Sequence, residues 1–214
     1  MEIKIADLRR DYSSQTLLEA DVASHPIDQF NKWWQEAIAS AIDEANAMTL
    51  ATASCDGMPS ARIVLLKGFS NEGFSFYTNY KSFKGIQLEE NPKACLLFFW
   101  KELERQVRIT GLVKKVAEEE SDEYFRSRPK SSRIGALASP QSQVIDSRNW
   151  IDENYIQLFE AYKENDPERP KHWGGYIVKP VIMEFWQGRP GRLHDRIQYT
   201  LEENGNWKIE RLAP

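Results

Sequence analysis

The sequence predicts a mainly antiparallel β-barrel into which helices are inserted, an α+β fold. Short segments that read as strands recur along the chain, and most are separated by turn signals such as Asp56-Gly57 and Asn204-Gly205. The regular strand–helix alternation of a doubly wound parallel sheet is absent. No glycine-rich loop of the GxGxxG or P-loop kind occurs, so a bound phosphate would be held by side chains and isolated backbone amides.

The chain opens with a polar segment that is followed by an amphipathic helix. Residues 1–25 show only weak periodicity, which indicates an arm outside the core. Pro26 suits the first position of a helix, and apolar residues then recur at helical spacing from Ile27 to about Ala47. We therefore expect an N-terminal arm over residues 1–25, partly mobile, and one domain over residues 26–214.

The remaining elements follow from changes in period and from the turns between them. A polar, serine-rich connection is expected between the last two helices. The predicted strands are 48–53, 61–67, 74–78, 94–100, 105–116, 176–186, 192–201 and 207–212, and the shorter helices are 81–90, 118–126 and 151–164.

Composition excludes several classes of function. A net charge of −4 argues against a general nucleic-acid binder. The longest apolar run, residues 94–100, is too short to cross a bilayer, and the charged N-terminus lacks the apolar core of a signal peptide. Cys55 and Cys95 have no CxxC spacing, which predicts buried, reduced thiols. We expect a cytoplasmic protein with neither a nucleic-acid nor a membrane partner.

The widely spaced histidines offer no metal-binding pattern, and we expect no metal site. Cations near the C-terminus are more informative. If residues 192–197 are extended, Arg192, His194 and Arg196 lie on one face. Guanidinium groups beside an imidazole suit a phosphate or carboxylate ligand. A solvated basic edge strand would give the same pattern.

Other segments carry similar groups, each with a simpler structural alternative. Arg62 and Lys67 bracket an apolar strand that we expect in the core, or they lie at its ends and reach solvent. Lys84 follows hydroxyl residues at a helix start, where anions bind but where an ordinary helix cap looks the same. The amide of Gln106 can form hydrogen bonds with the edge of a heterocycle or with a neighbouring backbone group.

A further segment places Tyr124 and Arg128 four residues apart, with Ser132 close behind. These side chains could bind a phosphate monoester, and a solvated helix end is the alternative. Cations, hydroxyls, amides and aromatic rings thus accumulate along the chain. That mixture favours a phosphorylated, planar, heteroaromatic ligand, because each charge-assisted hydrogen bond to phosphate contributes about 1.5–3 kcal/mol.

Taken in order, these segments closely resemble the pyridoxine/pyridoxamine 5′-phosphate oxidase family, from about Leu8 to Pro214. The terminal strings are the most specific. The matching strings are RIVLLK (62–67), FYTN (76–79), ERQV (104–107), YFRSRP (124–129), QS (141–142), WGG (173–175), EFWQG (184–188), RLHDR (192–196) and WKIERLAP (207–214).

The resemblance implies an FMN-binding split β-barrel that forms a homodimer with two interfacial sites. It implies that FMN contacts Arg62, Ile63, Val64, Leu65, Leu66, Lys67, Tyr77, Thr78, Lys84, Gln106, Gln141, Ser142, Trp186 and Arg196. It implies that substrate contacts Lys67, Tyr124, Arg128, Ser132, Arg192, Leu193 and His194, with the arm residues Arg9, Arg10, Asp11 and Tyr12 as a cover. Arg192 and His194 are the candidate catalytic residues.

The implied reaction is the oxidation of pyridoxine 5′-phosphate or pyridoxamine 5′-phosphate to pyridoxal 5′-phosphate, with O2 as acceptor and H2O2 as product. Another split-barrel FMN reductase, or a non-catalytic carrier of FMN or pyridoxal phosphate, is the alternative; the substrate residues argue against both. Phe83 departs from the Arg-Lys pair common in the family, so FMN affinity is expected to be weaker unless Lys81 or a backbone amide compensates.

Overall fold

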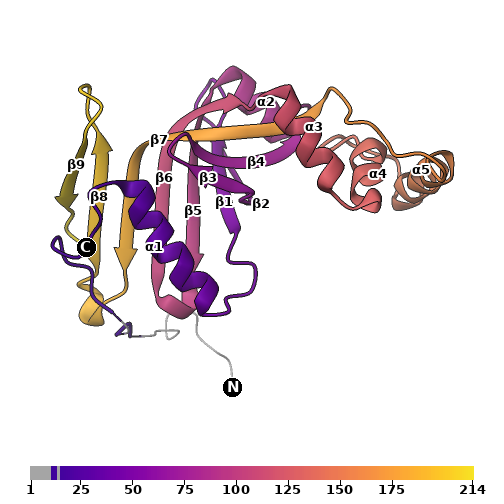
Figure 1. Ribbon diagram of the computed structural model, residues 1–214. Helices are drawn as coiled ribbons and strands as arrows, with labels where there is room; N and C mark the ends of the chain where they lie inside the picture. Colours follow the sequence, from indigo (N-terminus) through magenta and orange to yellow (C-terminus); the bar gives the residue numbers. More distant parts are fainter. Residues whose placement is uncertain (1–10, 14) are drawn as a thin grey trace. The chain divides into compact units, whose positions relative to one another are not determined.

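The computed structural model describes residues 11–13 and 15–214, and these residues form a nine-stranded sheet in the order β2-β1-β5-β6-β7-β4-β3, with β8 pairing to β7 and β9 (Figure 1). The registers of β3 with β4, β4 with β7, β7 with β8 and β8 with β9 are all antiparallel. The predicted antiparallel fold with inserted helices is therefore confirmed.

The bounds of the elements agree with most of the predicted segments. The strands are β1 (Ala47–Ala53), β2 (Pro59–Leu65), β3 (Gly68–Ser70), β4 (Gly73–Asn79), β5 (Lys93–Trp100), β6 (Arg105–Lys115), β7 (Trp173–Gln187), β8 (Asp195–Leu201) and β9 (Trp207–Arg211). The helices are α1 (Pro26–Ala39), α2 (Phe83–Glu90), α3 (Glu118–Ser127), α4 (Lys130–Ala138) and α5 (Arg148–Ala161), with 3-10 turns η2 (Lys101–Leu103) and η3 (Pro190–Arg192).

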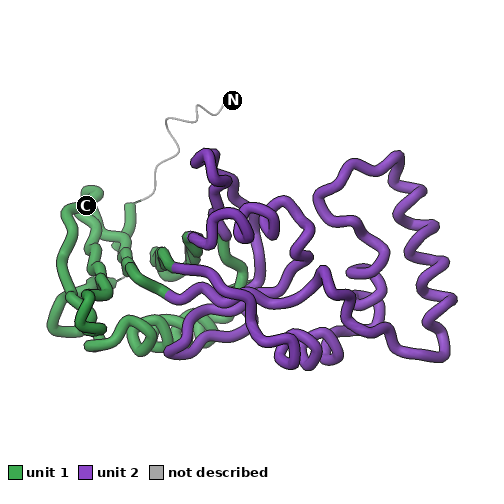
Figure 2. The backbone as a smooth tube through the Cα atoms, turned by 90° about the horizontal axis from the view of Figure 1, so that it is seen from above, with its two compact units in different colours: residues 1–49, 95–111, 180–214 green, residues 50–94, 112–179 purple. Residues whose placement is uncertain are grey.

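The chain divides into two compact units, which Figure 2 shows in different colours. Unit 1 comprises residues 1–49, 95–111 and 180–214, and unit 2 comprises residues 50–94 and 112–179. Strands β1, β5, β6 and β7 each contribute residues to both units.

In unit 1, helix α1 supplies the aromatic core. The helix begins where the His25 side chain accepts a hydrogen bond from the Ile27 amide, with Pro26 in the first turn. The Phe30 ring lies 5.3 Å from that of Phe98, and the Trp33 ring packs edge-on at 5.3 Å from that of Phe185. These contacts fix α1 through its buried stripe of side chains.

A buried arginine joins α1 to the strands of unit 1. Arg105 is 3% exposed, and its guanidinium lies 4.3 Å from the centroid of the Trp33 ring. It donates to Gln187 Oε1 at 2.9 Å, to Glu36 Oε2 at 2.5 Å and to Gln15 of the arm. Because every side of this cation has a partner, its burial is compensated.

In unit 2, β4 pairs with β7 at a glycine that makes room for an aromatic ring. Tyr77 pairs with Gly175 in the register of the two strands. A Cβ at Gly175 would lie only 2.7 Å from Cε1 of Tyr77 and 2.6 Å from Cγ2 of Val116. Glycine is therefore required at residue 175 for the Tyr77 ring to lie across β7.

Helix α2 begins at an N-cap, where the Ser82 side chain accepts a hydrogen bond from the Gly85 amide.

Some predicted boundaries are wrong. Helix α1 ends at Ala39 rather than near Ala47, because Ala41 and Glu44 adopt left-handed φ values of 51° and 48°. Helix α4 lies within the segment predicted as a serine-rich connection. It is only nine residues long and opens with the polar Lys-Ser-Ser sequence, which resembles a loop, and it is stabilised by burial of Ile134 and Ala138.

The environment of β2 and of the cysteines was also predicted wrongly. Strand β2 lies at the end of the sheet order, and Ile63 is 65% exposed, so this apolar strand is not in the core. Cys55 is exposed and Cys95 is half-buried, so neither thiol is fully buried. Apolar sequence alone did not distinguish a core strand from an apolar surface strand.

In the described part of the chain no helix is both long and apolar enough to cross a membrane. Over the same residues, no group of three or more His, Cys, Asp and Glu side chains is arranged to hold a metal ion.

We predict that Arg105→Met lowers the free energy of unfolding by about 2–4 kcal/mol, because it leaves the buried Gln187 oxygen without a donor. Urea denaturation measures the change. The control is Arg126→Met at an exposed position of α3, which should stay within about 0.5 kcal/mol of the unmodified protein. An equally small effect at Arg105 would contradict this account.

Candidate active site

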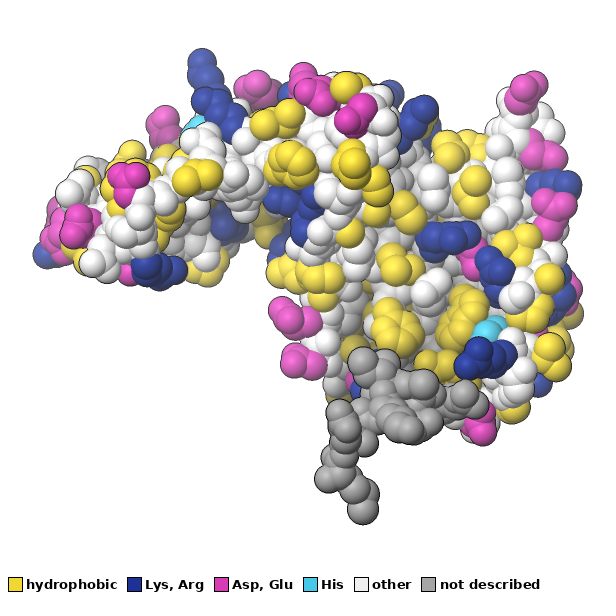
Figure 3. Space-filling model, turned by 180° about the vertical axis from the view of Figure 1, so that it is seen from behind, with side chains coloured by type: hydrophobic (Ala, Val, Ile, Leu, Met, Phe, Trp, Pro, Cys, Tyr) yellow, Lys and Arg dark blue, Asp and Glu magenta, His cyan; other side chains and the backbone are white. Residues whose placement is uncertain are grey.

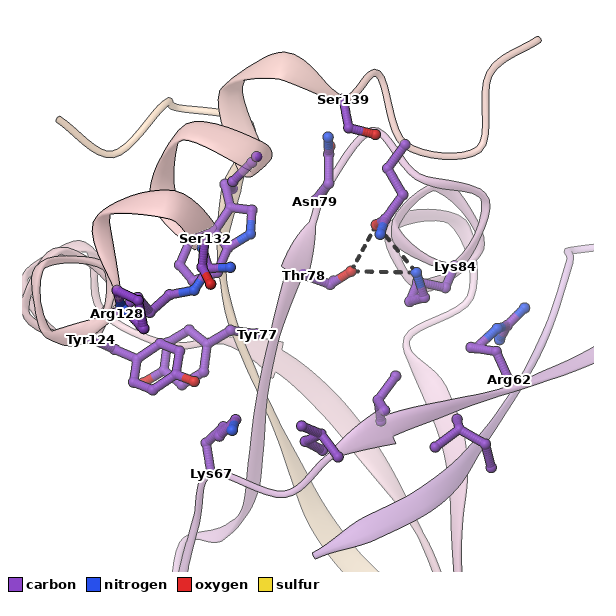
Figure 4. Close-up of a pocket in the computed structure, with 18 residues that line it drawn as sticks. Arg62, Lys67, Tyr77, Thr78, Asn79, Lys84, Tyr124, Arg128, Ser132 and Ser139 are labelled. Carbon is purple, nitrogen blue, oxygen red and sulfur yellow. Dashed lines mark hydrogen bonds between the residues drawn. The ribbon is translucent and has the colours of Figure 1, made fainter. Parts of the chain in front are cut away.

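Unit 2 contains a cavity of about 740 Å³ formed by β2, β4, α2 and the helices that follow β6 (Figure 4). Its size is typical of a site for a small molecule or cofactor. The lining residues include Arg62, Ile63, Val64, Leu65, Lys67, Tyr77, Thr78, Asn79, Lys84, Tyr124, Arg128, Ser132, Ser139, Gln141 and Trp173. Strand β2 ends at Leu65, so Arg62 within it and Lys67 beyond it can face the same cavity.

Arg62 enters the cavity from β2 with neutral partners only. Its guanidinium donates to Thr52 Oγ1 at 2.5 Å and to Ser60 Oγ at 2.7 Å. Among the described residues it forms no ion pair with a carboxylate. Burial lowers the pKa of Arg62, which means that the charged form lacks the solvation it would have in water.

Lys84, on the first turn of α2, faces the same space. Its Nζ lies 3.3 Å from Gln141 Oε1 and 3.4 Å from Thr78 Oγ1, and Figure 4 shows these contacts as dashed lines. Burial lowers the pKa of Lys84, and the charge of Arg62 lowers it further. An anion placed between the two cations would relieve both effects.

Arg128 follows the end of α3 and faces the cavity on another side. Its Nη1 is buried and has no hydrogen-bond partner among the described residues. Its guanidinium lies 4.6 Å from the centroid of the Trp173 ring, and burial lowers its pKa. Figure 4 shows Ser132 of α4 close to this arginine. A buried guanidinium nitrogen that has no partner among the described residues is suited to bind an anion.

Aromatic rings form a wall beside Arg128. The rings of Tyr77 and Tyr124 stack at 3.9 Å, and the Tyr77 ring lies 5.7 Å from that of Trp173. The Tyr77 hydroxyl donates to Glu120 at 3.1 Å, and burial followed by the charge of Glu120 raises the pKa of Tyr77. The cavity thus combines desolvated cations with flat apolar surface.

A second group of predicted residues lies in unit 1. The Trp186 and His194 rings are 4.6 Å apart, and Tyr12 stands edge-on to Trp186 at 5.7 Å. His194 Nδ1 accepts a hydrogen bond from the Arg189 amide at 3.1 Å, so the neutral ring carries its proton on Nε2. Burial lowers the pKa of His194, and the charge of Arg192 lowers it further.

The predicted extended face through Arg192, His194 and Arg196 is wrong. Arg192 belongs to η3 with a left-handed φ of 62°, and β8 begins only at Asp195. Arg196 instead donates to Glu184 Oε1 at 2.8 Å. The Pro190-Gly191 sequence starts a tight turn, which interrupts the alternation that an extended strand would show.

The other predicted residues are placed as follows. Leu66 is buried and does not line the cavity, and Ser142 follows Gln141 with a left-handed φ of 70°. Gln106 is half-buried in β6. Leu193 is 72% exposed. Asp11 is exposed, and Arg9 and Arg10 lie outside the described residues.

Sequence reasoning gave too little weight to one residue of the cavity. Trp173 was noted only as part of a matching string, yet it packs against Arg128 and Tyr77. Only tertiary structure brings it to the cavity, since it starts β7. Lys81 lines a different cavity from Lys84, and whether it compensates for Phe83 stays a prediction. Phe83 itself is 57% exposed.

Comparison with known families settles the relationship. The family described as "Pyridoxamine 5'-phosphate oxidase" matches residues 34–158, and the region described as "Pyridoxine 5'-phosphate oxidase C-terminal dimerisation region" matches residues 173–214. The chain belongs to the pyridoxamine 5'-phosphate oxidase family. The resemblance stated from the sequence is confirmed.

Full-length relatives are similar over the whole chain. A protein from Cupriavidus pinatubonensis named "Pyridoxine/pyridoxamine 5'-phosphate oxidase" is 54% identical over 211 residues, covering 99% of each chain. A protein of the same name from Nostoc punctiforme is 53% identical over 214 residues, covering 100% of each.

Solved structures support the fold. PhzG from Burkholderia lata, in complex with tetrahydrophenazine-1-carboxylic acid, superposes with a TM-score of 0.89 at 30% identity, covering 94% of this chain and 100% of that chain. A pyridoxamine 5'-phosphate oxidase-related, FMN binding protein from Nostoc punctiforme has a TM-score of 0.71 at 16% identity, covering 90% of this chain and 100% of that one. The expected split-barrel fold class of this family member is confirmed.

We predict that the imidazole of His194 titrates below the ordinary histidine pKa of ~6.5, and that Arg192→Gln raises its pKa because a neighbouring positive charge is lost. The measurement is NMR titration, which is tractable with only three histidines in the chain. Lys208→Gln on β9, which removes an exposed cation, serves as the control. A His194 pKa unchanged by Arg192→Gln would contradict the placement of Arg192.

Proposed function

We propose that this protein oxidises pyridoxine 5′-phosphate and pyridoxamine 5′-phosphate to pyridoxal 5′-phosphate, using FMN as cofactor and O2 as acceptor. The alcohol and O2 give the aldehyde and H2O2; the amine, O2 and water give the aldehyde, ammonia and H2O2. The observation that carries the proposal is a set of desolvated cations around one cavity with an aromatic wall: Arg62, Lys84 and Arg128, none of which has a carboxylate partner among the described residues. The full-length relatives named for this activity support it.

FMN, when bound, supplies a two-electron acceptor for hydride from the 4′ carbon of the substrate. The residues of the cavity fit such a group: Arg62 and Lys84 offer charge for its phosphate, and Thr78 and Gln141 offer hydrogen bonds beside them. We propose these roles together with those of residues 63–67, Tyr77, Gln106, Ser142, Trp186 and Arg196. Cations near a flavin also stabilise the negative charge that it gains on reduction.

We propose that the substrate phosphate binds at Arg128, with Tyr124, Ser132 and Lys67 beside it. The buried Nη1 of Arg128 gains a charge-assisted hydrogen bond there that the described residues do not provide. The Trp173 ring lies 4.6 Å from the Arg128 guanidinium and helps to fix its position. This arrangement favours phosphorylated over free vitamers.

We propose that His194 and Arg192 orient the substrate and assist proton movement, with Leu193 beside them. Since Nδ1 of His194 is engaged by the Arg189 amide, Nε2–H of the neutral ring is the available donor. The lowered pKa of His194 keeps this form dominant at neutral pH. Tyr12, together with residues 9–11, is proposed to cover the substrate.

We propose a homodimer with two interfacial sites in the cytoplasm. The match to a dimerisation region supports the dimer. Large apolar side chains are also exposed, including Ile63 on β2, Phe83 and Ile86 on α2, and Leu112 on β6. Figure 3 shows hydrophobic side chains mixed with Lys and Arg over one face of the molecule. Burial of such a surface is a common driving force for dimers.

The test is a visible spectrum of the purified flavoprotein, recorded before and after anaerobic addition of pyridoxine 5′-phosphate. We expect the bound flavin to bleach and air to restore its colour, with H2O2 and pyridoxal 5′-phosphate formed. Bleaching by a nicotinamide donor but by neither vitamer phosphate would favour a reductase. No bleaching by any of these donors would favour a carrier.

We predict that Arg128→Met raises KM for pyridoxine 5′-phosphate by about 10- to 100-fold, the loss expected for a charge-assisted hydrogen bond. Oxidation of unphosphorylated pyridoxine should change little, because this substrate has no phosphate for Arg128 to bind. Arg126→Met, at an exposed position of α3, is the matched control and should leave both unchanged. Equal losses with both substrates would refute the assignment of Arg128 to phosphate.

A further inference from the structure

The N-terminal arm of unit 1 is bound to the last strand through Arg211. This residue on β9 forms a bidentate ion pair with Glu19, in which Nε donates to Oε1 at 2.6 Å and Nη2 donates to Oε2 at 2.8 Å. Its Nη2 also donates to the Leu17 carbonyl at 2.9 Å, and its Nη1 to Asp195 Oδ1 at 2.8 Å. One guanidinium therefore joins two arm residues to the start of β8.

Asp195 completes this contact from the other side. Its Oδ2 accepts from the Leu17 amide at 3.1 Å and lies 3.5 Å from Nε of Arg189. The Leu17 side chain is only 4% exposed. The arm at Leu17 is thus held by its backbone amide, its backbone carbonyl and its side chain, which is unusual for a segment without regular structure.

The anchored stretch leads directly to the rings beside His194. Ser13 donates its amide to Glu104 Oε2 at 2.8 Å, and Tyr12 stands 5.9 Å from the His194 ring. Gly188 leaves room for this tyrosine, since a Cβ there would lie 2.7 Å from Cβ and Cγ of Tyr12. The position of Tyr12 therefore depends on how firmly the arm is held at Ser13, Leu17 and Glu19.

We propose that Glu19 and Arg211 are positioning residues that form a latch for the arm, holding Tyr12 over the substrate beside His194. This inference rests on the proposed function. The latch acts through Tyr12 and does not touch the reacting atoms, so it should control substrate affinity rather than the chemical step.

The chemistry of the latch suits a reversible closure. The Glu19 side chain is 56% exposed and that of Arg211 is 34% exposed, so water and salt can replace the contact. Surface ion pairs contribute measurably to stability when the arginine–carboxylate geometry is bidentate and the pair belongs to a network.

The test compares holoenzyme carrying Glu19→Gln with holoenzyme carrying Glu203→Gln. Glu203 is an exposed glutamate in the β8–β9 turn, so the control makes the same change of charge in the same unit. Glu19→Gln should raise KM for pyridoxine 5′-phosphate by about two- to fivefold, the size expected for one partly exposed ion pair. The kcat and the FMN content should not change, and the melting temperature should fall by no more than ~4 °C. Raising the salt concentration should bring the KM values of the two variants together, because salt screens the pair.

Amide hydrogen exchange supplies a readout that is independent of activity. Glu19→Gln should speed exchange at the Leu17 and Ser13 amides by about two- to fivefold. Unchanged exchange would overturn the latch. Faster exchange with unchanged KM would overturn its role in holding Tyr12 over the substrate. Failure of the proposed function would be seen earlier and separately, as an unmodified holoenzyme that oxidises neither vitamer phosphate.

Discussion

The positive charge enclosed by the cavity of unit 2 is the constraint on which the account of this protein depends. Arg62, Lys84 and Arg128 all have pKa values lowered by burial, and none has a carboxylate partner among the described residues. Desolvated cations of this kind destabilise the unliganded fold unless an anion binds between them. The arrangement therefore makes sense as a site prepared for phosphorylated ligands, whose binding also stabilises the native state.

Neutral rings near the proposed ligand sites are also held in defined positions. In unit 1 burial lowers the pKa of His194 and the charge of Arg192 lowers it further, while the Arg189 amide bonds Nδ1 and leaves the Nε2 proton available as a donor. In unit 2 a glycine at residue 175 leaves space for the Tyr77 ring, which stacks on Tyr124. We propose that the cations bind phosphate, whereas neutral rings and an uncharged imidazole face the part of the ligand that reacts.

Much of the site was predictable because its signals are local. Tyr124, Arg128 and Ser132 are close in sequence. A cation within an apolar strand, such as Arg62, predicts a partner or ligand for its charge. The face through Arg192 was predicted wrongly because Gly191 and Arg192 both take left-handed φ values, which hydrophobic patterning does not report. The role of Trp173 depends on tertiary packing. Helix α4 was missed because it is short and opens with polar residues that resemble a loop.

The most direct test of the central claim compares FMN with riboflavin, which lacks the phosphate, in titrations of the apoprotein. The account predicts that Lys84→Met weakens FMN binding by about 10- to 100-fold and leaves riboflavin binding nearly unchanged, because the lost charge faces the phosphate. Thr78 and Gln141, the neutral neighbours of Lys84, remain to keep the local structure. Equal weakening of both flavins, or of neither, would contradict the claim that the desolvated cations of this cavity exist to hold phosphate.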